Sequence, residues 1–274
     1  MNTLVMIGNH PRNIAFLEKL SEQKNVNIKG LILFKREKLM PKSVKKLSKN
    51  LEKLWKIHFN KRLIAEKKYF SFNSAIIKKF PKKIEISNAK ELNSKKIANY
   101  VKKKKFDSCF ISGAPIIKEP LLKCLPKNTV NLHLGLIPHY KGLITMFWPF
   151  YFLEPTMAGT TYHIIDKYID AGEILHNNVP LLKRGDGIHD VSCKALLSAH
   201  KDLPKVIKEI KKRIKYNIKP KSNFSLRNSG KLFLKKDWKP DLLKVIYTLF
   251  KDKIVDAYLD KKIDCKKPKL IKLK

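Results

Sequence analysis

The chain has 274 residues, 43% of them apolar, which is long enough for one large domain, or one domain with a modest appendage, around a sizeable core. Its apolar stretches are shorter than the roughly 20 residues of a membrane span, and no basic region precedes an apolar run at the N-terminus, so a cytoplasmic protein without membrane partners is expected. The formal net charge is +37, but only six of the 60 basic residues are arginine. Because arginine is the better phosphate ligand, this balance favours composition bias over a polyanion-binding surface.

The first part of the chain predicts a parallel βαβ opening. Residues 3–8 (TLVMIG) and 26–34 (VNIKGLILF) are apolar enough for buried strands, and 12–23 (RNIAFLEKLSEQ) between them has helical spacing. Such a parallel sheet needs helices on both of its faces. The segment 38–59 then predicts a packed helix. One face of that helix would carry Val44, Leu47, Leu51, Leu54 and His58.

The middle of the chain continues this alternation. Residues 82–87 predict a short strand, 94–105 a helix and 106–112 an apolar strand, and 158–180 predict two strands joined by a loop. A long helix is expected from 186 to about 213. The aromatic run 147–152 is interpreted as core.

The organisation expected from these elements is α/β, with a mostly parallel sheet sandwiched by helices and a small C-terminal α+β appendage. The main domain would span 1–213, a linker rich in Asn, Ser, Lys and Pro 214–230, and the extension 231–274. The extension would hold a strand near 230–236 and one helix over 239–259.

Residues 130–143 (VNLHLGLIPHYKGL) carry the first chemical signal. Side chains alternate along a strand, so Asn131 and His133 point the same way, and the ends of parallel strands open onto a ligand crevice. An amide and an imidazole aimed at one point can stabilise an oxyanion and move a proton. For this pair alone, the plainer interpretation that both satisfy loop backbone groups is favoured.

A second signal lies 37 residues after His133, where Asp170 precedes Ala171 and Gly172 between two apolar strands. A carboxylate at this place could orient His133 and raise its pKa. Taken alone, an Asp before small residues is typical of a turn.

Together the segments 131–142 (NLHLGLIPHYKG), 159–166 (GTTYHIID) and 168–175 (YIDAGEIL) resemble the motifs of folate-dependent formyltransferases, in the same order and at the same spacing. That family of 10-formyltetrahydrofolate-dependent N-formyltransferases includes sugar N-formyltransferases and methionyl-tRNA formyltransferase. The resemblance covers roughly residues 1–210 and implies a Rossmann-like fold.

The resemblance also implies roles for individual residues. Asn131 and His133 would stabilise the oxyanion of a tetrahedral intermediate, and Asp170 would hold His133 and assist proton removal from an amine. The formyl donor would be 10-formyltetrahydrofolate, and no metal is needed. Two positions depart from the family pattern, because Gly135 stands where Ser is usual and Lys141 where Arg is usual.

The pterin of the donor would lie against main chain from three segments. Carried over by position, its contacts are Ala114, Ile116, Gly135, Leu136, Ile137, Pro138 and Asp166. His163 matches a common family position, but a role as a satisfied strand residue is favoured for it.

The acceptor is expected to be a small-molecule amine, most of all an amino sugar in nucleotide-linked form. Methionyl-tRNA is an alternative partner, because 38–48 (KLMPKSVKKLS) resembles the lysine-rich loop of the enzymes that formylate it. Glycinamide ribonucleotide, or water as in formyltetrahydrofolate deformylases, are further alternatives. A homodimer is left open.

Overall fold

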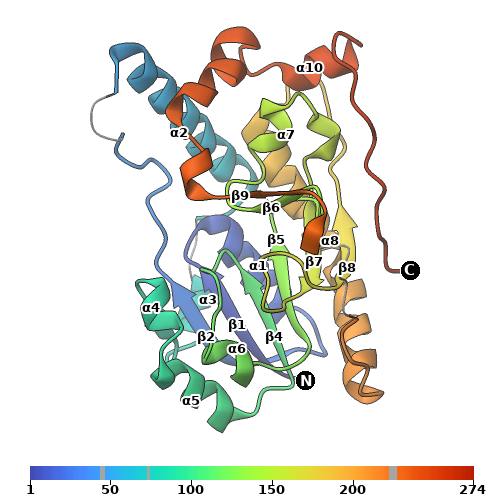
Figure 1. Cartoon of the computed structure of the whole chain (residues 1–274). Coiled ribbons are helices and arrows are strands. Elements are labelled where there is room, and N and C mark those ends of the chain that lie inside the picture. The colour runs from blue at the N-terminus through green and yellow to red at the C-terminus, as the bar shows by residue number, and fades with distance from the viewer. Residues whose placement is uncertain (44–46, 73–74, 222–226) are drawn as a thin grey trace.

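The computed structural model describes residues 1–43, 47–72, 75–221 and 227–274, and its centre is a seven-stranded sheet in the order β3-β2-β1-β4-β5-β7-β8 (Figure 1). The strands from β3 to β5 are parallel, whereas β7 runs antiparallel to both β5 and β8. The expected mostly parallel α/β sheet is therefore confirmed. The strands are β1 (Asn2–Gly8), β2 (Asn27–Phe34), β3 (Ile84–Ile86), β4 (Ser108–Ser112), β5 (Thr129–His133), β7 (Thr160–Ile164) and β8 (Ile174–Asn178).

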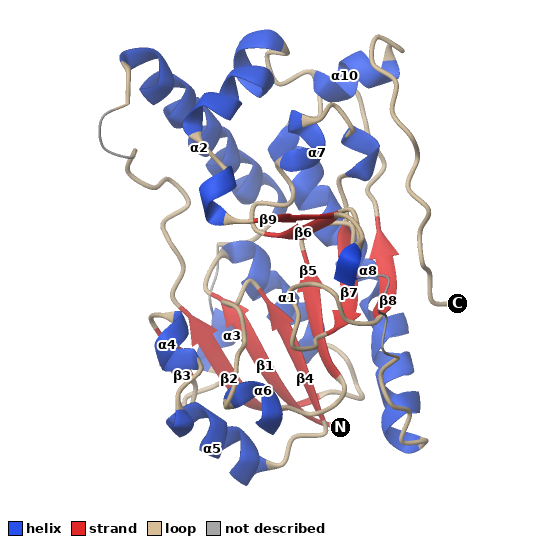
Figure 2. Ribbon diagram, in the orientation of Figure 1, coloured by secondary structure: helices blue, strands red, loops and turns tan. Residues whose placement is uncertain are grey.

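Helices cover both faces of the sheet (Figure 2). On one face, Val5 and Ile7 pack with α1 (Pro11–Ser21), α3 (Ala75–Lys78) and α8 (Ile188–Lys215). On the other face, Leu4 and Met6 pack with α4 (Ala89–Leu92), α5 (Lys95–Lys104) and α6 (Leu121–Cys124). Because successive strand residues point to opposite faces, a strand covered on both sides needs a continuous apolar run, as β1 has from Leu4 to Ile7.

The strand order reverses beside β1. The chain passes from β1 outward to β2 and β3, and then returns to the other side of β1 with β4 and β5. Ligands of open α/β sheets bind at the carboxyl edge near such a reversal. In Figure 1, the short strands β6 (Tyr140–Gly142) and β9 (Lys231–Phe233) and the helix α7 (Trp148–Tyr151) lie beyond that edge.

Helix α2 (Lys49–Tyr69) begins later than the sequence predicted. The hydroxyl of Ser48 accepts a hydrogen bond from the Leu51 amide at 3.4 Å, and this cap sets the start of the helix. The predicted start at residue 38 is therefore wrong, and Val44 lies outside the described residues. The buried residues of α2 are Trp55, His58, Ala65 and Glu66.

The predicted single helix over 239–259 is also wrong. The segment forms a 3₁₀ turn at Pro240–Leu242, a π-helical turn at Val245–Leu249 and the helix α10 (Ile254–Leu259). The break occurs at Lys251 and Asp252, whose φ angles are 51° and 62°. The Asp252 carboxylate accepts a 3.0 Å hydrogen bond from the Ile188 amide at the start of α8, and this contact outside the segment competes with helix continuation.

The extension shares a hydrophobic cluster with the segment that follows β5. Phe233, Leu243 and Ile246 pack there with Tyr140 and Trp148. The long helix expected to end near residue 213 ends at Lys215, and the linker predicted over 214–230 includes residues 222–226, outside the described ones. The division into 1–213 and 231–274 stays a prediction. None of the helices in the described ranges is both long and apolar enough to cross a membrane.

Candidate active site

Asn131 and His133 lie on one face of β5, at its carboxyl end. The antiparallel neighbour β7 places His163 directly opposite Asn131. The Nε2 atom of His163 lies 3.0 Å from Nδ2 of Asn131 and 3.5 Å from Oδ1 of Asp170. The amide of Asn131 and the carboxylate of Asp170 thus both lie within 3.5 Å of the same nitrogen of one buried imidazole.

The imidazole of His133 is buried, with 7% of the side chain exposed. Its Nε2 lies 2.9 Å from the backbone oxygen of Tyr140, and since a carbonyl oxygen only accepts, Nε2 carries the hydrogen. Its Nδ1 faces Oδ2 of Asp170 at 3.4 Å. Burial lowers the pKa of His133 although the Asp170 carboxylate opposes this shift, so the ring is neutral at pH 7 and Nδ1 can accept a proton.

Asp170 lies in the loop between β7 and β8 with a φ of 48°, a left-handed conformation that Asp tolerates better than most residues. Its Oδ2 accepts a 2.8 Å hydrogen bond from the backbone N–H of Gly142. Burial would raise the pKa of Asp170, but His133, His163 and the Gly142 N–H together hold that pKa below its usual range. The carboxylate therefore stays ionised beside the ring of His133.

Gly135 makes room for this arrangement. A Cβ atom at residue 135 would lie 2.6 Å from both Nε2 of His133 and the backbone oxygen of Tyr140. The departure from the Ser that is usual in the family thus occurs where the His133 ring meets Tyr140.

The residues expected to hold the pterin border the same edge. Gly135, Leu136 and Ile137 are buried. The hydroxyl of Thr161 donates to the Gly135 oxygen at 2.7 Å and accepts from the Ile137 amide at 3.0 Å, and the Leu136 oxygen accepts from the Tyr140 amide at 2.9 Å. These backbone groups are already engaged within the fold, which the sequence did not indicate.

The remaining expected contacts are more open. Ala114 and Pro138 are half-buried, and Ile116 is 46% exposed. The Asp166 carboxylate accepts a 2.8 Å hydrogen bond from the Tyr168 amide and so shapes the loop before Asp170. Contact of these residues with a folate stays a prediction.

Three arginines lie at the carboxyl edge of β1 and β2, on the other side of the strand reversal. Arg36 and Arg62 both approach the Glu37 carboxylate, at 3.2 and 3.7 Å, and Arg36 donates to the Gly113 oxygen at 3.4 Å after β4. Arg12 pairs with the buried Glu66. Burial, with repulsion from Arg12, lowers the pKa of Arg62 to about 10. Three of the six arginines of the chain therefore lie here, and the net charge alone did not predict this.

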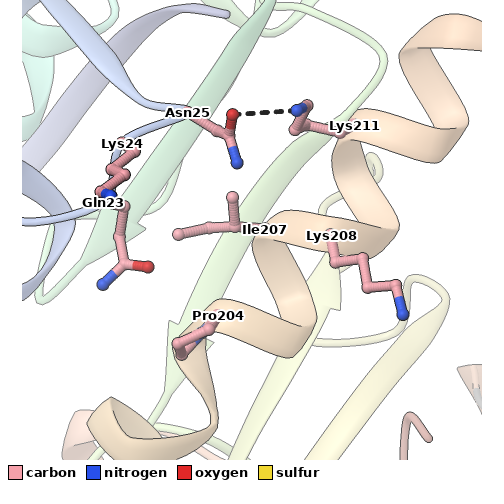
Figure 3. A pocket seen from close by; sticks show the side chains of 7 residues that line it. All are labelled: Gln23, Lys24, Asn25, Pro204, Ile207, Lys208 and Lys211. Carbon is pink, nitrogen blue, oxygen red and sulfur yellow. Dashed lines mark hydrogen bonds between the residues drawn. The ribbon is translucent and has the colours of Figure 1, made fainter.

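A hollow of about 220 Å³ lies elsewhere (Figure 3). Asn25 accepts a 2.9 Å hydrogen bond from Lys211 there. Because Asn25 lies two residues before the start of β2, the hollow is at the amino edge of the sheet. It does not touch the residues around His133. Its lining comprises Gln23, Lys24, Asn25, Pro204, Ile207, Lys208 and Lys211. Among the described residues, no group of three or more His, Cys, Asp or Glu could hold a metal ion.

The sequence comparison finds a relative in Wigglesworthia glossinidia brevipalpis, the bifunctional polymyxin resistance protein ArnA. It is 31% identical over 149 residues, which are 53% of this chain and only 22% of that protein. The chain thus matches about a fifth of that relative's length.

Two solved structures share the fold. A sugar N-formyltransferase from Shewanella sp has a TM-score of 0.56 at 14% identity, covering 91% of this chain and 88% of that one. A phosphoribosylglycinamide formyltransferase from Anaplasma phagocytophilum has a TM-score of 0.53 at 20% identity, covering 77% and 87%. The family model described as "Formyl transferase" matches residues 4–207, most of the chain, and the chain therefore belongs to the formyl transferase family.

Proposed function

We propose that this protein transfers the formyl group of 10-formyltetrahydrofolate to the primary amine of an amino sugar in nucleotide-linked form. One observation carries the proposal: in a member of the formyl transferase family, a neutral His133 faces an ionised Asp170 at 3.4 Å, beside Asn131 at the carboxyl edge of the sheet. An acid–base pair beside an amide donor is what formyl transfer between two nitrogens needs.

The reaction assigns one task to each side chain. The amine nitrogen attacks the formyl carbon, and the carbonyl oxygen becomes an oxyanion that Asn131 stabilises by a hydrogen bond and that His133 stabilises once its Nδ1 atom has taken up a proton. The pair of His133 and Asp170 takes the proton that the amine loses. The bond from the formyl carbon to N10 of the folate then breaks, and N10 receives that proton as tetrahydrofolate leaves. One oxyanion donor contributes about 3–4 kcal/mol to such a barrier.

Two observations support an anionic acceptor that carries a sugar. Arg36 and Arg62 meet at Glu37, and Arg36 also reaches the Gly113 oxygen, across the strand reversal from His133, where diphosphate oxygens would find charged donors. The similarity to the Shewanella sugar N-formyltransferase also covers 91% of this chain, so it must include part of the chain after residue 213. The similarity to the phosphoribosylglycinamide formyltransferase covers only 77%. The extension therefore fits the sugar enzymes better.

The test combines the purified protein, 10-formyltetrahydrofolate and a panel of amines, and follows release of tetrahydrofolate. The panel holds nucleotide-linked 4-amino sugars, glycinamide ribonucleotide and methionyl-tRNA, with a no-amine control. We expect turnover with a nucleotide-linked amino sugar. Turnover only with one of the other amines would replace the proposed acceptor, and release without any amine would identify a deformylase.

A further inference from the structure

The short strand β6 touches both members of the candidate acid–base pair through its backbone. The N–H of Gly142 donates to Oδ2 of Asp170 at 2.8 Å, and the oxygen of Tyr140 accepts from Nε2 of His133 at 2.9 Å. The position of β6 therefore decides where the carboxylate and the ring lie.

The other side of β6 is held by the C-terminal extension. Strand β9 pairs with β6 in parallel, with Lys231 opposite Tyr140 and Phe233 opposite Gly142. The Leu143 amide adds a 2.8 Å hydrogen bond to the Phe233 oxygen. We call residues 227–233 the strap; Figure 2 shows its strand β9 lying along β6, beyond the end of β5.

One side chain anchors the strap. Phe233 is 1% exposed, and its ring stacks on Trp148 at 4.4 Å and on Tyr140 at 5.9 Å between centroids. Its neighbours Leu232 and Leu234 are 41% and 39% exposed. The burial of Phe233 thus fixes β9 at this place, while the residues on either side add little.

Two glycines with positive φ permit the close approach of the strap. Gly142 has a φ of 92°, and a Cβ atom there would lie 2.1 Å from the oxygen of Phe233. Gly230 has a φ of 68°, and its Cβ atom would lie 1.7 Å from the oxygen of Pro138. Any side chain at either residue would push β6 and the strap apart.

The strap also reaches the loop that carries Asp170. The Nζ atom of Lys141, 4% exposed, donates to the backbone oxygen of Arg227 at 3.2 Å. The guanidinium carbon of Arg227 lies 4.4 Å from the ring centroid of Tyr168, two residues before Asp170. The strap thus contacts both β6 and the loop of residues 166–170, the two segments whose relative position sets the Gly142 to Asp170 hydrogen bond.

We infer that the strap is a positioning element for the reaction: by holding β6 and the loop of residues 166–170 together, it keeps the Asp170 carboxylate against the ring of His133. This inference rests on the proposed function. Loss of the strap should lower turnover more than donor binding, because most of the expected folate contacts, from Ala114 to Ile116 and from Gly135 to Ile137, lie outside the strap and the loop of residues 166–170. The residues of the strap act through Asp170 and touch no reacting atom.

The decisive variant is Gly142→Ala, with Gly185→Ala as its matched control. Both glycines have a positive φ, 92° and 84°, but a Cβ atom at Gly185 meets nothing within 4 Å. We expect Gly142→Ala to lower kcat at least tenfold with a KM for the folate within threefold of wild type, and Gly185→Ala to retain wild-type turnover. Because the nearby Asp170 carboxylate raises the pKa of His133, its displacement should also move the acid limb of the kcat profile, where His133 becomes protonated, to lower pH.

A second variant tests the strap in case Gly142→Ala does not fold. Phe233→Leu keeps an apolar side chain in the cluster but loses both ring stacks, and Leu234→Ala is its exposed neighbour control. With thermal unfolding monitored for both, we expect a fall in kcat and the same shift of the acid limb for Phe233→Leu only.

A readout independent of turnover separates this inference from the proposed function. The NMR titration of the His133 ring, assigned by the loss of its signal in His133→Gln, should shift to lower pH in Gly142→Ala, because the carboxylate that raises the pKa of His133 is displaced. If no amine is formylated, the titration still tests the strap. Identical titrations and kinetics in Gly142→Ala and Gly185→Ala would overturn the inference.

Discussion

Histidines are buried in several regions of this molecule, and two of these regions differ in what faces the ring. His133 has the Asp170 carboxylate at 3.4 Å. His58 is a buried residue of α2, and its ring instead has the Tyr247 hydroxyl at 2.8 Å and the ring of His189, in α8, at 4.5 Å between centroids. Burial, reinforced by the charge of Arg62, lowers the pKa of His58 to about 3.

The comparison shows that burial alone does not make a histidine useful for proton transfer. Both rings are neutral at pH 7, but only His133 has a partner that would stabilise the imidazolium when a proton arrives. The pair of His133 and Asp170 is therefore expected to act in turnover, whereas His58 and His189 are expected to act in stability. The following changes test that division.

The largest effect is expected for His133→Ala and Asp170→Asn, which should lower formyl transfer by about 10³-fold or more. Folate binding should be largely retained, because these groups act on charge that develops in the transition state. Turnover and folate affinity would be measured side by side, with the exposed Asp241→Asn as control. Wild-type rates in Asp170→Asn would refute the proposed mechanism.

Asn131→Ala should lower kcat by about 10² to 10³, the usual scale for one oxyanion donor. Its effect on the KM for the amine should be small, because the hydrogen bond strengthens as the oxyanion forms. Steady-state kinetics with the best acceptor would measure both. A change confined to KM would assign Asn131 to ground-state binding instead.

His58→Ala should affect folding and not chemistry. Removal of a buried ring that packs against Phe59, Phe147 and Trp238 is expected to lower the free energy of unfolding by about 2–4 kcal/mol. The kcat per folded molecule should stay within about twofold of wild type. Denaturant titration gives the first quantity, and Leu181→Ala, 76% exposed in the native protein, serves as the neutral control.

Acid should destabilise the protein through His58 and through His200, another buried histidine. The pKa of His58 is lowered to about 3 and that of His200 to about 4 from 6.5. Below pH 6.5 the unfolded chain binds protons that the folded chain does not. The free energy of unfolding therefore decreases as the pH is lowered, by up to about 1.4 kcal/mol per pH unit for each histidine. Thermal unfolding between pH 7 and 5 would measure this. His58→Phe should flatten the curve, and an unchanged slope would contradict the assignment.

The smallest effect is expected from the overall charge. If the lysines are composition bias, tRNA should bind weakly, lose affinity steeply between low and physiological salt, and leave turnover unchanged. Competition of tRNA with the amine at physiological salt would instead assign function to the basic surface. Binding and turnover would be followed in the same salt series.

The sheet and part of the site could be predicted because they depend on local patterns. The apolar run of β1 and the alternation that puts Asn131 and His133 on one face are properties of a few consecutive residues. Asp170 followed from its place in a motif. The roles of all three stay predictions, and their geometry is compatible with them.

Other features depend on contacts between distant segments. His163 lies beside Asn131 because β7 pairs with β5 in an antiparallel register, and local sequence patterns do not predict that register. The predicted C-terminal helix is broken where Asp252 binds the first turn of α8. Helix α2 starts late because the Ser48 cap sets its first residue, although the apolar spacing of a helix face begins earlier in the sequence. Local periodicity carries no information on such long-range pairing.

The shared cluster around Phe233 has a consequence for synthesis of the chain. Tyr140 and Trp148 leave the ribosome long before Phe233, Leu243 and Ile246 complete the cluster that buries them. The nascent chain therefore carries these aromatic rings uncovered while the sheet beneath them can already form. The crevice of His133 is completed only when residues 227–246 have been made, so a chain released before them would lack the residues that finish the site.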